Sequence, residues 1–169
     1  MKKSLVRVLG TVGALGLLTA AAGGAQAGPN DPVFFRAGAF QCRIAPDGSL
    51  GCDLTSPYNP PLASISLTKT DTGSTTALTR GIDLPVPFPV WQVVIDNPAM
   101  PALPGMGGGT PFTLPGGNPD FAAIANERGP WGPRLRAFGS TCEIGFHGSF
   151  FCNAKGHGFT AWSGYLRMG

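Results

Sequence analysis

The stretch RAGAFQCRIAPDGSLGC at residues 36–52 returns at residues 136–152 as RAFGSTCEIGFHGSFFC, one hundred residues later and without a gap. In each copy two cysteines enclose nine residues. Seven positions are identical: Arg36/Arg136, Ala37/Ala137, Cys42/Cys142, Ile44/Ile144, Gly48/Gly148, Ser49/Ser149 and Cys52/Cys152. The repeat predicts two β-hairpins, each closed by its own disulfide, Cys42–Cys52 and Cys142–Cys152.

The cysteine spacing also predicts the turn at each hairpin tip. If Cys42 faces Cys52 across an antiparallel pair, a three-residue loop at 46–48 connects the strands. Such a loop favours glycine at its third position, where the backbone is left-handed, and both Gly48 and Gly148 stand there. Because side chains alternate along a strand, the same register places further pairs on the cysteine face, which we expect to be the core face: Ile44–Leu50 and Ile144–Phe150.

Four cysteines permit three pairings, and crossed pairing between the hairpins is the alternative to local closure. A zinc site is disfavoured, because paired zinc-binding cysteines usually lie two to four residues apart. Closing each eleven-residue loop should stabilise the fold by about 2.5–3 kcal/mol in the loop-entropy model.

The first 27 residues predict a secretory signal peptide. Lys2, Lys3 and Arg7 precede an apolar run at about 8–22, and small residues end in Ala-Gln-Ala at 25–27. The run is shorter than the roughly 20 residues that a membrane-spanning helix needs. We expect cleavage before Gly28 and a single β-rich domain at 28–169. This domain would be secreted, extracellular or loosely associated with the cell envelope, with no integral membrane segment after cleavage.

The charge of the predicted mature chain argues against nucleic acid as a partner. The whole sequence has 12 basic and 9 acidic residues, and three of the basic ones lie in the leader. The remainder therefore carries nine charges of each sign. Without a basic excess, neutralisation of phosphates cannot supply affinity.

Composition and pattern predict a mainly β fold, either a small antiparallel β-sandwich or a barrel-like domain with long loops. All 17 prolines and 21 of the 26 glycines follow residue 27. Apolar and polar residues alternate at 63–68, a weaker returning strand is expected at 75–80, and a stronger one at 91–95. Residues 98–119 form a Gly/Pro-rich loop. One short helix is predicted near 119–128, with Asn118 as its cap, Pro119 at its first position and Gly129 as its end.

Few residues offer reactive chemistry. The two histidines are His147, at a hairpin tip, and His157, between two glycines. A hydrolase that uses His157 is a minor alternative, since the sequence has no Gly-x-Ser-x-Gly motif. We expect no enzyme activity, no catalytic residue, no cofactor and no metal.

Aromatic residues supply the candidate binding sites. Exposed aromatic rings can stack on sugars or contact peptides with little loss of entropy, and the alternative is that they anchor the core or the loops. The candidates are Trp91, Trp131, Trp162, Tyr165 and the loop residue Phe112, together with His157.

The two cysteine blocks resemble a family of small exported actinobacterial proteins of unknown function. The matching residues are 40–54, including Cys52-Asp53, and the segment from Cys152-Asn153 through Gly156-His157-Gly158-Phe159 to Tyr165. The chain departs from that family before its first cysteine, where Gly38-Ala39-Phe40-Gln41 replaces Pro-Ser-Gly-Asn. The resemblance implies export and a paired-hairpin fold, and it implies no activity or ligand.

These observations favour a secreted non-catalytic binding or structural protein of the bacterial envelope or extracellular space. Its partner would be a cell-wall glycan or an extracellular protein. The alternative is a secreted inhibitor or toxin-like effector, in which residues 98–119 present an extended segment to another protein.

Overall fold

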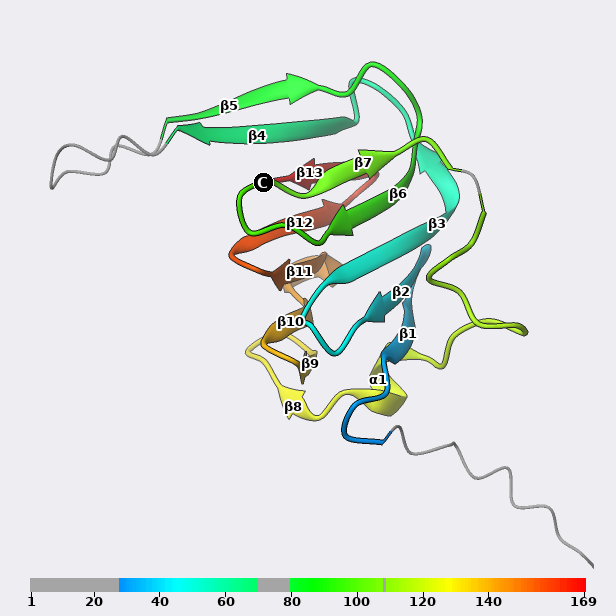
Figure 1. Cartoon of the computed structure of the whole chain (residues 1–169). Coiled ribbons are helices and arrows are strands. Elements are labelled where there is room, and N and C mark those ends of the chain that lie inside the picture. Colours follow the sequence, from blue (N-terminus) through cyan, green and yellow to red (C-terminus); the bar gives the residue numbers. More distant parts are fainter. Residues whose placement is uncertain (1–27, 70–79, 108) are drawn as a thin grey trace, which may run out of the picture.

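The computed structural model describes residues 28–69, 80–107 and 109–169, and shows a mainly β protein with one short helix. The predicted leader and residues 75–79 of the predicted returning strand lie outside the described residues. Two sheets face each other (Figure 1). Sheet A has the order β1-β2-β3-β6-β7 and sheet B the order β5-β4-β13-β12-β11-β10-β9-β8. All neighbouring strands are antiparallel except β13 and β4, which are parallel.

The strands of sheet A are β1 (Val33–Ala37), β2 (Phe40–Ile44), β3 (Leu50–Tyr58), β6 (Val90–Ile95) and β7 (Leu103–Gly105). Those of sheet B are β4 (Ala63–Lys69), β5 (Arg80–Pro85), β8 (Glu127–Arg128), β9 (Pro133–Ala137), β10 (Ser140–Ile144), β11 (Phe150–Ala154), β12 (His157–Trp162) and β13 (Tyr165–Met168). The sequence predicted strands at 63–68 and 91–95, and β4 and β6 confirm them. The returning strand is β5, and of the predicted range 75–80 only residue 80, its first residue, is described.

Both predicted hairpin clamps are present. Cys42 is bonded to Cys52 and Cys142 to Cys152, and each pair is directly opposed across its two strands. The tip of the first hairpin spans residues 46–48, since Ala45 N donates to Ser49 O at 2.8 Å. Gly48 and Gly148 have φ values of 78° and 74°, as the loop type requires.

The core lies between the sheets, on the cysteine faces of both hairpins. Phe40 of sheet A packs against Phe150 and Phe159 of sheet B, with ring centroids 5.3 and 5.4 Å apart. Both disulfides are fully buried in the same cluster. The predicted inward pairs Ile44–Leu50 and Ile144–Phe150 are opposed in register. The clamps therefore join the strands at the centre of the sandwich.

The repeat extends beyond the hairpins to five strands. In sheet A, β3 pairs with β6 through Cys52 and Val93, and β6 pairs with β7 through Val93 and Pro104. The same relation in sheet B joins Cys152 to Phe159 and Phe159 to Met168. Strands β1-β2-β3-β6-β7 thus correspond to β9-β10-β11-β12-β13. The hairpin β4-β5 is inserted in the first copy and extends the sheet of the second.

The first hairpin tip packs against the second copy. Ser140 Oγ donates to Gly48 O at 2.7 Å, and a Cβ on Gly48 would stand 2.6 Å from Phe138 O. At the other copy's tip, Gly148 lines a small pocket together with Gly38 and Ala39. Each tip thus lies beside the tight turn that joins the first two strands of the other copy, and the two copies form one unit.

The Gly/Pro-rich segment crosses the outer face of sheet A after β7. We call residues 109–119 the strap. Phe112 N and Thr113 Oγ1 donate to Asp53 Oδ2 at 2.9 and 2.7 Å, and Gln92 Nε2 donates to Asp53 Oδ1 at 2.9 Å. The Phe112 ring lies where a side chain on Gly51 would otherwise stand. The strap is therefore held by polar and apolar contacts to strands β3 and β6.

The helix prediction is corrected in its cap and length. Helix α1 spans Phe121–Ile124 only, and Asp120, not Asn118, accepts the capping bond, from Ala122 N at 3.0 Å. Asn118 is buried, and its Nδ2 donates to three carbonyl oxygens, those of Phe35, Cys42 and Phe112. These long-range bonds fasten the end of the strap, and the chain after α1 enters β8 at Glu127, two residues before Gly129, the predicted end of the helix.

Candidate functional site

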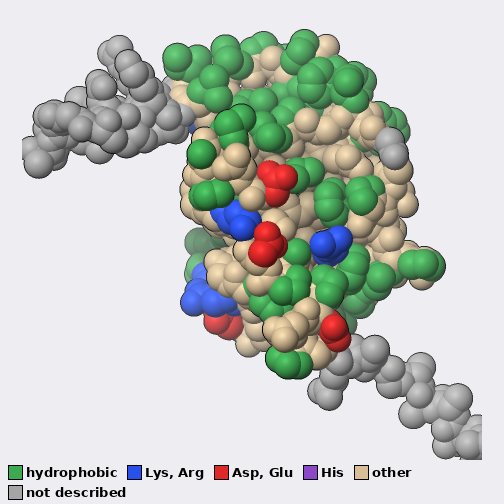
Figure 2. Space-filling model, in the orientation of Figure 1, with side chains coloured by type: hydrophobic (Ala, Val, Ile, Leu, Met, Phe, Trp, Pro, Cys, Tyr) green, Lys and Arg blue, Asp and Glu red, His purple; other side chains and the backbone are tan. Residues whose placement is uncertain are grey.

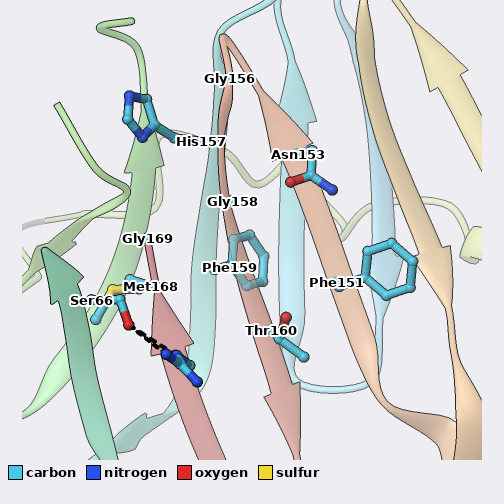
Figure 3. Close-up of a pocket in the computed structure, with 11 residues that line it drawn as sticks. Ser66, Phe151, Asn153, Gly156, His157, Gly158, Phe159, Thr160, Met168 and Gly169 are labelled. Atoms are coloured by element: carbon cyan, nitrogen blue, oxygen red, sulfur yellow. Dashed lines mark hydrogen bonds between the residues drawn. The ribbon is translucent and has the colours of Figure 1, made fainter. Parts of the chain in front are cut away.

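The outer face of sheet B carries an open pocket of about 300 Å³. It lies over β11, β12, β13 and β4 (Figure 3), because alternation along these strands turns one residue in two away from the core. The side chains that line it on this face are Phe151 and Asn153 of β11, Thr160 of β12, Arg167 of β13 and Ser66 of β4. Its floor includes the backbone at Gly156, Gly158 and Gly169.

A polar network borders one side of the pocket. Arg167 Nε and Nη2 donate to Ser66 Oγ at 3.0 and 2.8 Å. Arg167 Nη2 also pairs with Asp83 Oδ1 at 3.2 Å. Ser66 Oγ in turn donates to Asp83. The Arg167 and Asp83 side chains are each about half exposed. The network therefore presents a positioned, charge-balanced set of hydrogen-bonding groups to solvent.

An aromatic pair stands at the end of the same face. Trp162 and Tyr165 flank the β12–β13 turn and oppose each other in register, with ring centroids 5.9 Å apart and planes within 23° of parallel. They remain 42% and 48% exposed. Because Trp162 follows Thr160 by two residues and Tyr165 precedes Arg167 by two, both rings lie on the pocket's side of the sheet. Two of the predicted binding residues thus extend this face.

The other predicted binding residues are dispersed. Trp131, 63% exposed, meets Phe146 at the second hairpin tip with centroids 5.0 Å apart. Trp91, on sheet A, lines a separate hollow with Met106 and Gly107. Phe112 packs in the strap over Gly51. The six candidates therefore do not form one site.

His157 lies at the rim of the pocket and points away from Asn153 and Thr160 (Figure 3). Its Nε2 lies 3.0 Å from Pro98 O, to which it donates. This contact ties β12 to the segment that precedes β7. The geometry gives His157 a role in joining chain segments.

A buried ion pair lies on the same sheet, away from the pocket. Glu143 of β10 is 3% exposed and accepts from Arg134 Nε. This hydrogen bond raises the pKa of Arg134 above its ordinary value. A Cβ on Gly129 would overlap the Glu143 carboxylate, so the β8–β9 turn covers it. The pair is a packing element that fixes β8 on the sheet.

Within residues 28–69, 80–107 and 109–169, no three His, Cys, Asp or Glu side chains are grouped so that they could hold a metal ion. No helix in the described part of the chain is long and apolar enough to cross a membrane.

Sequence reasoning missed Asn153, Thr160, Arg167, Ser66 and Phe151. The alternation of side chains around Cys152 could have identified Asn153 and Phe151. Because Cys152 faces the core, its two neighbours must face outward on β11. The approach of β4 to β13 depends on a parallel pairing between distant segments and leaves no local pattern.

The fold and this face define a class: a disulfide-clamped β-sandwich of two five-stranded copies, with one outer face covered and the other open. Comparison of the chain with protein-family models, curated proteins and solved structures found no match.

Proposed function

We propose that this protein is a secreted, non-catalytic binding domain of the bacterial envelope or extracellular space, and that it binds a cell-wall glycan on the outer face of sheet B. The observation that carries the proposal is that the exposed Trp162–Tyr165 pair, at the β12–β13 turn, lies on the same outer face of sheet B as the polar pocket of Asn153, Thr160 and Arg167. Binding sites of this kind combine aromatic surface with a few positioned polar groups.

A sugar polymer suits this combination. One face of a sugar ring is apolar and its rim carries hydroxyl groups, so it can stack on aromatic surface and exchange hydrogen bonds with amide, hydroxyl and guanidinium groups. The sheet face supplies all three polar types within one pocket. The local charge of Arg167 is balanced by Asp83, which favours a ligand without strong net charge.

The distribution of charge supports a neutral polymer over a polyanion. On the face drawn in Figure 2, basic and acidic side chains lie interspersed. Several of the basic groups are paired, as Arg36 is with Asp120 at 3.7 Å and Lys155 with Asp47 at 3.4 Å. Such pairs leave little net positive potential for binding phosphates.

The alternative function, an inhibitor that presents residues 98–119 to another protein, receives less support. The strap is bound to its own sheet through Asp53 and Asn118, and its Phe112 ring packs against the backbone of Gly51. An inhibitory segment that inserts into a partner's groove would need these side chains to be available for contact with the partner.

Co-sedimentation of the mature oxidised protein with purified bacterial cell walls tests the proposal. We expect the wild type to bind, and the double variant Trp162→Ala/Tyr165→Ala to bind at least about tenfold more weakly, because aromatic contacts dominate binding of this kind.

The matched control is Trp131→Ala/Phe146→Ala, which removes a more exposed aromatic pair from another part of the surface. This variant should bind walls like the wild type. Equal losses in both double variants, or no wall binding by the wild type, would contradict the proposal.

A further inference from the structure

The duplication presents the same sheet face in two states, one filled and one open. On sheet A, Asp53 is 4% exposed, and its carboxylate accepts a backbone N–H and a hydroxyl from the strap. The strap therefore acts as a ligand that the chain supplies to itself. The corresponding position on sheet B, Asn153, lies exposed in the pocket.

The register establishes which residues correspond. Asp53 opposes Gln92 on sheet A, and Asn153 opposes Gly158 on sheet B. The side chain of Gln92 occupies one oxygen of Asp53, whereas Gly158 has no side chain, and a Cβ built there would overlap Asn153 Oδ1. Gly158 therefore leaves room for the Asn153 amide and offers it no side-chain hydrogen bond of the kind that Gln92 gives Asp53.

The aromatic part of the strap contact also has a counterpart. The Phe112 ring lies over Gly51, and the residue of sheet B that corresponds to Gly51 is Phe151. Sheet B therefore supplies its own aromatic ring beside Asn153. A ligand on sheet B therefore needs to supply only polar groups, like the N–H and the hydroxyl that the strap donates on sheet A, and no aromatic ring.

We infer that Asn153 recognises an acetamido group, so that the ligand of the sheet B face is an N-acetylated glycan. A carboxylate such as Asp53 only accepts, and its strap partners are an amide N–H and a hydroxyl. A carboxamide both accepts and donates, and an acetamido group offers it an N–H and a C=O together. The neighbouring hydroxyls of the sugar then meet Thr160 and Arg167. This inference rests on the function proposed above and narrows its ligand.

The topology favours a sugar over a peptide as the source of that amide. Peptides commonly bind sheets by pairing with a free edge strand. The pocket lies over β11, β12, β13 and β4, each of which has a neighbour on both sides. Their backbone groups are used within the sheet, so recognition at this face falls to side chains.

Titration calorimetry with three oligosaccharides of equal length tests the inference: one of N-acetylglucosamine, one of glucose, and one of N-acetylglucosamine after deacetylation. We expect the acetylated oligomer to bind about tenfold tighter than the glucose oligomer, which has a hydroxyl in place of the acetamido group. Asn153→Ala should abolish this preference, and Asn153→Asp should reduce it. Asn30→Ala, an exposed asparagine before β1, is the control that leaves it unchanged.

The outcomes separate the two proposals. Equal affinity for the acetylated and glucose oligomers, or a preference that Asn153→Ala leaves intact, overturns the inference while the glycan function stands. If a synthetic peptide with the strap sequence TPFTLPGGN binds more tightly than any oligosaccharide, the amide that Asn153 recognises belongs to a peptide, and the assignment to a glycan is overturned. If the wild-type protein binds neither the oligosaccharides nor cell walls, both the inference and the proposed glycan function are overturned.

Discussion

At the scale of single residues, Asp47 shows how one side chain fixes a hairpin tip. Its Oδ1 accepts from Ser49 Oγ at 2.6 Å and from Ser49 N at 3.0 Å, and its Oδ2 pairs with Lys155 Nζ at 3.4 Å. The second hairpin has His147 at this place, with φ of 54°. The copies therefore share the loop length and the glycine at its third position, but the backbone at the second position differs and the two tips are held by different contacts.

These contacts predict a pH dependence. The hydrogen bonds from Ser49, followed by Lys155, lower the pKa of Asp47 from 3.8 to about 2. Since the folded-state pKa lies below the unfolded one, the contribution to stability is fully present above pH 3.8 and is lost as the pH falls towards about 2. NMR titration of the carboxyl carbon should give this low value, and Ser49→Ala should raise it.

The duplication supplies the control for that titration. Ser149→Ala makes the same change in the second hairpin, where no aspartate stands, and should leave the pKa of Asp47 unaltered. A pKa near 3.8 in the wild type would show that the Ser49 contacts do not persist in solution.

Residues with local roles were predictable, and residues with long-range roles were not. The cysteine pairs and the tip glycines Gly48 and Gly148 follow from spacing within one hairpin. Asn118 was predicted as a helix cap because it precedes Pro119 and Asp120. Its actual bonds reach Phe35 and Cys42, more than seventy residues away. No local pattern contains that information.

At the scale of elements, the strap and sheet A are complementary surfaces. Gly51 leaves a gap on β3, the Phe112 ring fills it, and Asp53 takes the adjacent polar groups of the strap. A long Gly/Pro-rich segment is ordered in this way without helix or extensive strand. Sequence composition predicted a loop at residues 98–119 and missed β7 within it, since three residues are too few for a recognisable pattern.

A double-mutant cycle tests this complementarity. Gly51→Ala places a methyl group against the Phe112 ring and should destabilise the protein by about 1–3 kcal/mol, as overpacking does. In a Phe112→Ala background the same change should cost close to nothing, because the ring is gone. Urea unfolding measures both values. An equal cost in the two backgrounds would mean that the ring does not occupy the gap.

At the scale of the whole molecule, the duplication sets what the two faces can do. Sequence identity exposes only the copies at 36–52 and 136–152, whereas the structural correspondence continues through β6-β7 and β12-β13. In these later strands the two copies keep the same pairing register, but the side chains at equivalent positions differ, as at Gln92 and Gly158. One copy binds its own strap, and the other leaves Asn153 to solvent.

We propose that the outer face of sheet B, and not the strap or the surroundings of Trp131, binds the ligand. NMR titration of the nitrogen-15-labelled protein, residues 28–169, with solubilised cell-wall glycan provides the test. We predict concentration-dependent shifts of backbone amides at 151–153, 158–162 and 165–167, and none in the strap at 112–118. Shifts confined to the strap or to the surroundings of Trp131, or no shifts at all at saturating glycan, would exclude this face as the glycan-binding site.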